Sequence, residues 1–388
     1  MLRCASVYTC EVDDFDIAMN EINSQINEKL SLLDNTIAVI MCHTEFIESG
    51  MVKHICDSLP FELAGVTTSS QAVNETASDV VLTIFIMTSD DVYFRSGITG
   101  SLENDLYLPA KEAYDKIGIT ETPKLALVFP PLPDKYAGDA YVDAWEKVTP
   151  GVPVYGTFST ADTADFSGGK VIYNGEASDT CMSFIYCYGN INPRFLIGTF
   201  SEKNAMPYHG EITKSNGTCV EEINNIKAYT YFEELGLAKD GEPNSIFTFV
   251  PFLIDQKNRR DYDGVPILRE LVTFNEDGSA IFRGNIDEFS TFKMLHGTFE
   301  DVILIAEEQL EEAVSLPDIN GILTFSCIAR RMMVMQKDSL RELNIARKKI
   351  GNIPFMMGYA GGEICPTSVN DGIATNRYHD YSIITMII

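Results

Sequence analysis

Long apolar runs and an N-terminal signal sequence are both missing from this chain of 388 residues. No apolar segment is long enough to cross a bilayer, and no basic stretch followed by an apolar core stands at the N-terminus. Basic residues are also scarce, with 29 Lys and Arg against 56 Asp and Glu and a formal net charge of -27. Because such a field repels phosphate and anionic lipid, we expect a cytoplasmic protein without nucleic-acid partners or membrane insertion.

Cysteine pairs and cysteine–histidine clusters are missing as well. The nine cysteines are scattered singly, and none has the C-x-x-C spacing of a zinc or redox site. Several lie inside apolar segments such as 37–42 and 180–189. We therefore expect most of them to be buried small side chains in a reducing compartment, with no disulfide and no metal site.

Sequence motifs of complete catalytic sites do not occur in the chain. It contains no phosphate-binding Walker loop, no nucleophile elbow, no paired metal ligands and no dinucleotide-binding fingerprint. The sequence therefore favours a binding protein over an enzyme.

Three stretches of the chain, 37–87, 124–189 and 322–388, share one order of elements. Each contains an apolar strand, a helical segment, a short strand led by proline, a loop with glycine and a final strand. Six apolar residues in a row are typical of strands buried on both faces. We predict an α+β fold of mixed, stacked β-sheets flanked by helices, built from internally repeated β-α-β-β units in two related halves. The three Pro/Gly loops should converge on one face.

The joint between the two predicted domains lies between the second and third stretches. Residues 212–228 read as a hairpin around the Asn216–Gly217 turn. A helix is expected over 228–237, followed by a polar loop at 239–243. These signals place an N-terminal domain at 1–225 and a C-terminal domain at 226–388.

The last third of the chain carries a recognisable pattern. The apolar strand 322–327 ends in Ser-Cys with an arginine close behind, a Gly-x-x-x-Gly-Glu-Ile loop follows at 358–364, and His379 precedes the last strand. The segment PVYGTFSTAD at 153–162 adds a second Gly-containing loop. In this order the chain resembles FIST domains, N-terminal and C-terminal parts together. Thr157 and Asp380 depart from the family, which commonly has glycine and asparagine there.

The resemblance implies a bacterial sensory module that binds a small molecule, such as an amino acid or small carboxylate, and relays the signal to a separate protein. That partner would be a histidine kinase, a cyclic-di-nucleotide enzyme or a chemoreceptor. We expect no cofactor. Because some relatives act as haem-based nitric oxide sensors, the alternative is that the chain binds haem. The matching positions make up the expected ligand-binding set: Ser326, Cys327, Arg330, Gly358, Gly362, Glu363, His379, Gly156 and Asp162.

The chemistry of this set leaves alternatives open. Arg330 offers a planar fork of donors to a carboxylate, and Glu363 could accept from an ammonium group, so together they would match both ends of an amino acid. The two side chains could instead pair only with each other. Arg331 should point the opposite way, into solvent.

His379 and Cys327 also have more than one interpretation. His379 is a structural residue, a ligand contact or a haem ligand. Cys327 is a buried thiol or, with His379 and Glu363, the nucleophile of a thiol enzyme.

Overall fold

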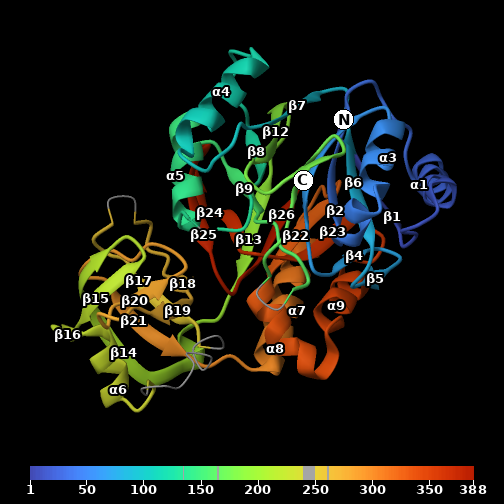
Figure 1. The fold of residues 1–388 in the computed structure, drawn as a ribbon. Coiled ribbons are helices and arrows are strands. Elements are labelled where there is room, and N and C mark those ends of the chain that lie inside the picture. The colour runs from blue at the N-terminus through green and yellow to red at the C-terminus, as the bar shows by residue number, and fades with distance from the viewer. Residues whose placement is uncertain (134, 164–165, 239–249, 260–261) are drawn as a thin grey trace.

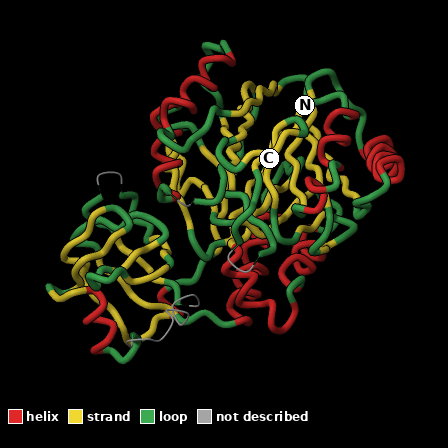
Figure 2. The backbone as a smooth tube through the Cα atoms, viewed as in Figure 1, coloured by secondary structure: helices red, strands yellow, loops and turns green. Residues whose placement is uncertain are grey.

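The computed structural model describes residues 1–133, 135–163, 166–238, 250–259 and 262–388, and the loop expected at 239–243 lies outside them. The described residues form three six-stranded sheets and one eight-stranded sheet (Figures 1 and 2). The six-stranded sheets are mixed, the pairs of the eight-stranded sheet are antiparallel, and helices lie against the sheets, so the predicted α+β class is confirmed. Within the described ranges, no helix has the length and apolar character needed to cross a membrane.

Each six-stranded sheet draws its strands from distant parts of the chain. In spatial order, the first contains β1 (Arg3–Thr9), β6 (Leu82–Thr88), β2 (Thr36–Cys42), β3 (Glu62–Thr67), β10 (Val171–Tyr173) and β11 (Glu176–Ser178). The second contains β7 (Val92–Ile98), β12 (Ser183–Gly189), β8 (Leu125–Phe129), β9 (Val154–Thr157), β24 (Glu363–Asn370) and β25 (Ile373–His379). The third contains β13 (Arg194–Gly198), β26 (Ile383–Ile387), β22 (Ile322–Cys327), β23 (Phe355–Ala360), β4 (Gln71–Val73) and β5 (Ala77–Ser78).

The three sheets share one pairing order. In each, the third and fourth strands run parallel, and the neighbours on either side of them run antiparallel. The outer hairpin of each sheet comes from a stretch of chain that builds another sheet: β4–β5 joins the third, β10–β11 the first and β24–β25 the second. This exchange ties the three sheets together. The chain is therefore arranged as three like-paired sheets with an inserted fourth, which differs from the expected two halves.

The eight-stranded sheet is inserted between β13 and α7 and lies to one side of the other three (Figure 1). Its strands are β14 (Ala205–Asn216), β15 (Cys219–Ile223), β16 (Ile226–Lys227), β17 (Phe252–Asp255), β18 (Ile267–Arg269), β19 (Leu271–Phe274), β20 (Ala280–Phe282) and β21 (Thr291–Leu295). The β14–β15 hairpin turns at Asn216–Gly217 as predicted. Because β14 and β15 pair with strands that follow residue 225, the expected domain limit falls inside this inserted sheet.

Helices cover the outer face of each six-stranded sheet. The first carries α1 (Phe15–Lys29), α2 (Glu45–Glu48) and α3 (Met51–Ser58), the second α4 (Tyr107–Ile117) and α5 (Gly138–Val148), and the third α7 (Phe299–Ser315), α8 (Ile328–Asp338) and α9 (Arg341–Ile350). The inserted sheet carries α6 (Ala228–Glu234) and the 3₁₀ turn η1 (Glu202–Asn204). The inner faces of the three sheets share one apolar core. That core holds the three central strand pairs in fixed relation.

Two local predictions differ from the structure. The segment 45–58 was expected as one helix but breaks at Gly50, whose φ of 83° only glycine adopts readily. The segment after Cys327 forms the helix α8. No side chain caps the N-terminus of this helix, so the sequence carries no capping signal for it. Six of the nine cysteines are buried, as expected.

Candidate ligand-binding site

The loops that follow β3, β9 and β23 converge, as the sequence suggested. Each loop is hydrogen-bonded through its backbone to the next, so the three close a ring at the ends of the central parallel strands. We call this place the loop junction and define it by residues 67–71, 157–162 and 359–363. The three bonds run from Thr160 N to Thr67 O (3.0 Å), from Ser69 N to Tyr359 O (3.1 Å) and from Gly361 N to Phe158 O (3.1 Å).

The region around the loop junction contains buried polar atoms that have no hydrogen-bond partner. Buried polar groups in proteins nearly always have a hydrogen-bond partner, so each buried polar atom without one needs an explanation. Of the twelve such side-chain atoms found in the described residues, eight come from the junction and from the segments packed against it. They are Thr68 Oγ1, Ser69 Oγ, Gln71 Oε1, Arg330 Nη1, Arg331 Nε, Tyr359 Oη, Glu363 Oε1 and Asp380 Oδ2.

Arg330 lies at the start of α8 and is fully buried. Its Nη2 donates to Glu342 Oε1 at 2.6 Å and to the Val302 carbonyl at 3.0 Å. Ser326 donates to the other oxygen of Glu342 at 3.0 Å. The partner of Arg330 is therefore Glu342 of α9 rather than Glu363, while Nη1 keeps a free donor.

Arg331 is not in solvent, contrary to expectation. It lies on a helix instead of a strand, and only 6% of its surface is exposed. Its guanidinium donates to Asp162 Oδ1 at 3.1 Å and to Asp79 Oδ1 at 3.2 Å. Arg331 thus ties α8 to the second loop of the junction through Asp162, and to the segment after β5 through Asp79.

Glu363 begins β24 and is fully buried. Ser382 Oγ donates to its Oε2 at 2.7 Å, and Oε1 has no partner. Burial raises the pKa of this carboxyl well above its usual range, and the nearby charge of Asp380 raises it further. Burial and the charge of Asp380 thus both disfavour the ionised form of the Glu363 side chain.

Asp380 lies beside Glu363 and was not in the expected set. Tyr378 Oη donates to its Oδ1 at 2.7 Å, while Oδ2 has no partner. Burial raises the pKa of Asp380 to about 6, with Arg269 opposing the shift. Two buried carboxyl groups, each with a partner at one oxygen only, therefore lie near each other where β24 begins and β25 ends.

Cys327 ends β22 next to these carboxyl groups. Burial raises the pKa of its thiol well above the ordinary value, and the charges of Glu363 and Asp380 add to the shift. The thiolate needed for nucleophilic attack is therefore strongly disfavoured.

His379 is buried in β25, and its Nε2 lies 3.1 Å from the carbonyl of Cys365. Burial lowers the pKa of the imidazole to about 4, so the ring is neutral and donates to that carbonyl. These surroundings favour the interpretation of His379 as a structural histidine.

The three glycines of the expected set serve close packing. A side chain on Gly156 would meet the Val128 carbonyl of β8, and one on Gly358 would meet Met41 of β2. Gly362 has a φ of 124° and lies against the Tyr378 ring, so a β-carbon there would clash. Gly362 thereby allows Tyr378 to reach Asp380.

A second buried charge pair joins the junction region to the inserted sheet. Asp139 of α5 accepts from Arg269 Nη2 of β18 at 2.8 Å and from the Asn285 backbone N–H at 2.8 Å. Arg269 Nη1 also donates to the Tyr378 carbonyl at 3.1 Å. Both oxygens of the carboxylate have partners, which marks a structural joint.

The sequence reasoning missed several residues of the loop junction and of the segments packed against it, namely Thr68, Ser69, Gln71, Arg331, Glu342, Tyr359 and Asp380. The first three lie in the loop after β3, which matched the recurring order of elements but carried no family motif. Its run of Thr, Ser and Gln between two apolar strands was the available signal. Glu342 gave no signal, because its pairing with Arg330 depends on how α8 and α9 fold back.

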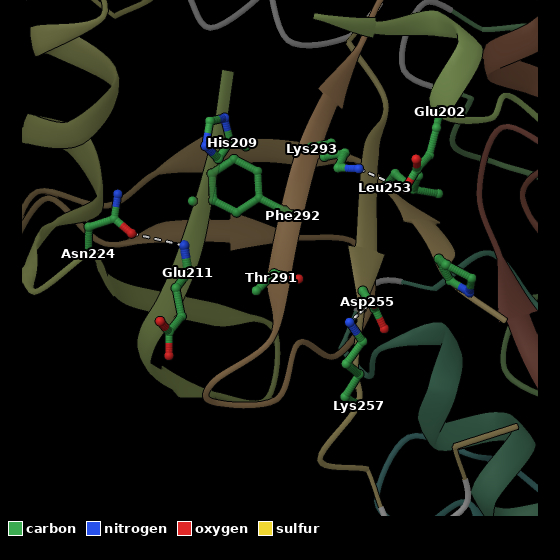
Figure 3. A pocket seen from close by; sticks show the side chains of 12 residues that line it. Glu202, His209, Glu211, Asn224, Leu253, Asp255, Lys257, Thr291, Phe292 and Lys293 are labelled. Carbon is green, nitrogen blue, oxygen red and sulfur yellow. Dashed lines mark hydrogen bonds and ion pairs between the residues drawn. The ribbon is translucent and has the colours of Figure 1, made fainter. Parts of the chain in front are cut away.

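A separate pocket of about 470 Å³ lies on the inserted sheet (Figure 3). Four of its charged side chains form two pairs, Lys293 with Glu202 at 2.7 Å and Lys257 with Asp255 at 3.0 Å, and Glu211 also lines it. None of the expected site residues lines it. Because both lysines already have carboxylate partners, the pocket offers a weaker case for a specific ligand.

Comparison with known families agrees with this architecture. A FIST N domain model matches residues 36–226 and a FIST C domain model matches residues 228–366. Together the two matches cover most of the chain, which therefore belongs to the FIST family. FIST domains are sensory domains of signal-transduction proteins.

Other comparisons are less informative. No curated protein matches the chain. Among solved structures, a cyanuric acid hydrolase from A. caulinodans is similar over 100% of this chain and 99% of its own, with 10% sequence identity and a TM-score of 0.34. At that score the likeness supports no argument about this chain.

Proposed function

We propose that this chain is a sensor whose small-molecule ligand binds at the loop junction. The observation that carries the proposal is the set of eight buried polar atoms without a hydrogen-bond partner in the loop junction and in the segments packed against it. A ligand, or water that a ligand displaces, would supply the missing partners. Donors and acceptors are both present, so the site suits a molecule that has both.

The charges around the junction favour a ligand with an ammonium group. Arg330 is neutralised by Glu342, and Arg331 is shared between two aspartates. The two arginines and their three carboxylate partners thus leave an excess of negative charge. The free oxygens of Glu363 and Asp380 can accept from an ammonium group, and Arg330 Nη1 can donate to a carboxylate. An amino acid meets these demands better than a simple carboxylate does.

We infer binding rather than thiol catalysis at this place. Cys327 is held as a neutral thiol, and His379, the base expected for a thiol enzyme, is bonded to a backbone carbonyl. The signal would then pass to a separate protein, and it can do so only if the ligand binds two conformations with different affinity.

A thermal-shift screen with amino acids and small carboxylates tests the proposal. A ligand present at 100 times its Kd adds about 2.7 kcal/mol to stability. Hits are then titrated against Glu363→Gln and against Glu202→Gln, a matched change in the pocket of Figure 3. We expect weaker binding only for the first variant. Equal affinity for both variants would place the ligand elsewhere.

A further inference from the structure

The three six-stranded sheets each end in an edge strand that occupies the same position: β1, β7 and β13. An edge strand presents unpaired N–H and C=O groups, and proteins usually block them. The three edges can therefore be compared by how their unpaired backbone groups are blocked.

The edge of β1 is blocked by side chains of α1. Gln25 accepts from the Tyr8 N–H at 3.2 Å and donates to the Tyr8 carbonyl at 2.7 Å. Lys29 donates to the Ser6 carbonyl at 2.8 Å. A further strand cannot pair there without displacing both side chains.

The edge of β7 is blocked in a similar way. Asn35 accepts from the Phe94 N–H at 3.3 Å and donates to the Val92 carbonyl. Arg95 donates to the Phe94 carbonyl at 2.6 Å. Two of the three equivalent edges are thus occupied by polar side chains.

The edge of β13 is open. Ser382 and Ile388 flank β26 and bond to Cys327 and Gly321 on the side of β22. Because bonding directions alternate along a strand, the odd-numbered residues of β26 bond to β13. Their partners in β13 are Arg194, Leu196 and Gly198. Phe195 and Ile197 therefore direct their N–H and C=O groups outward, and in the described part of the chain no hydrogen bond reaches them.

A groove of about 500 Å³ runs along this open edge. On one side lies α7 with Ile305, Glu308 and Glu312, and on the other side lie Pro366 and Thr367 of β24. The two glutamates are the charged residues of the lining, and both are exposed. The groove therefore combines free backbone groups with one acidic wall.

We propose that the β13 edge is the docking site for an extended segment of a partner protein, which adds a strand to the third sheet and carries basic side chains toward α7. Backbone hydrogen bonds to Phe195 and Ile197 would hold the segment. Alternate side chains of the segment would contact the residues that line the groove and give specificity. A second copy of this chain fits poorly, because both grooves are acidic and each copy carries a net charge of -27. The inference does not depend on the ligand proposed for the loop junction.

A labelled seven-residue peptide of alternating Lys and Val is the probe, with fluorescence anisotropy as the readout. Two further peptides carry N-methyl groups on the Lys amides or on the Val amides. Side-chain and hydrogen-bonding directions alternate together along a strand, so only one set of amides can face β13. We expect one methylated peptide to lose at least tenfold in affinity and the other to bind as the parent does. Equal binding of the two would overturn strand addition.

Variants of the protein locate the site. Ile197→Pro removes one outward N–H at an edge position where proline is tolerated, and it should weaken binding at least tenfold. Glu308→Lys with Glu312→Lys should do the same, while Glu233→Lys with Glu234→Lys on α6 changes the charge equally and should not. If Ile197→Pro fails to fold, the charge variants and the methylated peptides still test whether the peptide adds a strand at this edge. If the native chain forms a dimer and Ile197→Pro dissociates it, the occupant of the edge is a second copy of this chain, and the proposal of a partner protein is overturned.

Discussion

The loop junction and the joint to the inserted sheet both bury charged side chains, but they satisfy them differently. At the joint, both oxygens of Asp139 have partners and Arg269 donates to four groups. At the junction, Glu363 and Asp380 each keep one free oxygen, and Arg330 keeps a free donor. Complete pairing indicates a structural role, whereas incomplete pairing leaves room for a ligand. The predictions below test this difference.

The largest effect is expected at the joint. Asp139→Ala leaves the Arg269 guanidinium buried without its carboxylate, which should cost about 3 to 5 kcal/mol of stability. Chemical denaturation measures the loss, and hydrogen exchange should show the inserted sheet opening first. In the double variant Asp139→Leu with Arg269→Met no charge is left unpaired, so most of the loss should be recovered. A mild effect of Asp139→Ala alone would contradict the structural role.

The next effect depends on pH. The pKa of Asp380 is raised to about 6 in the folded protein from an ordinary value near 3.8, so the folded state binds the proton more tightly. Its contribution to stability is therefore present below about pH 4 and is lost as the pH rises through about 6, by up to about 3 kcal/mol. Asp380→Asn should remove this dependence.

The effect of pH on the stability of the native chain also includes His379, which acts in the opposite direction to Asp380. The variant must therefore be compared with the native chain. Its pKa is lowered to about 4, so its contribution is lost as the pH falls from about 6.5 toward 4. The difference in unfolding free energy between the native chain and Asp380→Asn, measured from pH 4 to 7.5, isolates Asp380. A difference that stays constant over this range would mean that Asp380 is not buried as described.

A smaller effect on stability, but a clear one on binding, is expected for Glu363→Gln. The amide has nearly the shape of the carboxyl group and can accept from Ser382, so unfolding free energy should change by no more than about 1 kcal/mol. Affinity for an ammonium ligand should fall at least tenfold, about 1.4 kcal/mol, because an ammonium group favours the ionised carboxylate and the amide cannot ionise. Calorimetric titration measures it. A large loss of stability with normal affinity would make Glu363 structural.

The sequence predicted the central strands and the convergence of the loops, because apolar runs and Pro/Gly punctuation are local signals. It did not predict Arg331 correctly, since α8 begins directly after a strand with no capping side chain, and a strand interpretation turns alternate residues to opposite faces. The partner of Arg330 could not be predicted either. Glu342 lies twelve residues further on, and only the packing of α8 against α9 brings the two together.

The smallest effect is expected for Cys327→Ser, which separates the sensor from a thiol enzyme. The thiol is buried and held neutral, so its replacement by a hydroxyl should change ligand affinity by less than about threefold, under about 0.7 kcal/mol. A thiol enzyme would lose turnover almost entirely, because serine without a base is a far weaker nucleophile. Titration of the ligand and an assay for its chemical conversion by mass spectrometry, both with the native chain and the variant, give the two readouts. Conversion of the ligand by the native chain that Cys327→Ser abolishes would make the junction a catalytic site.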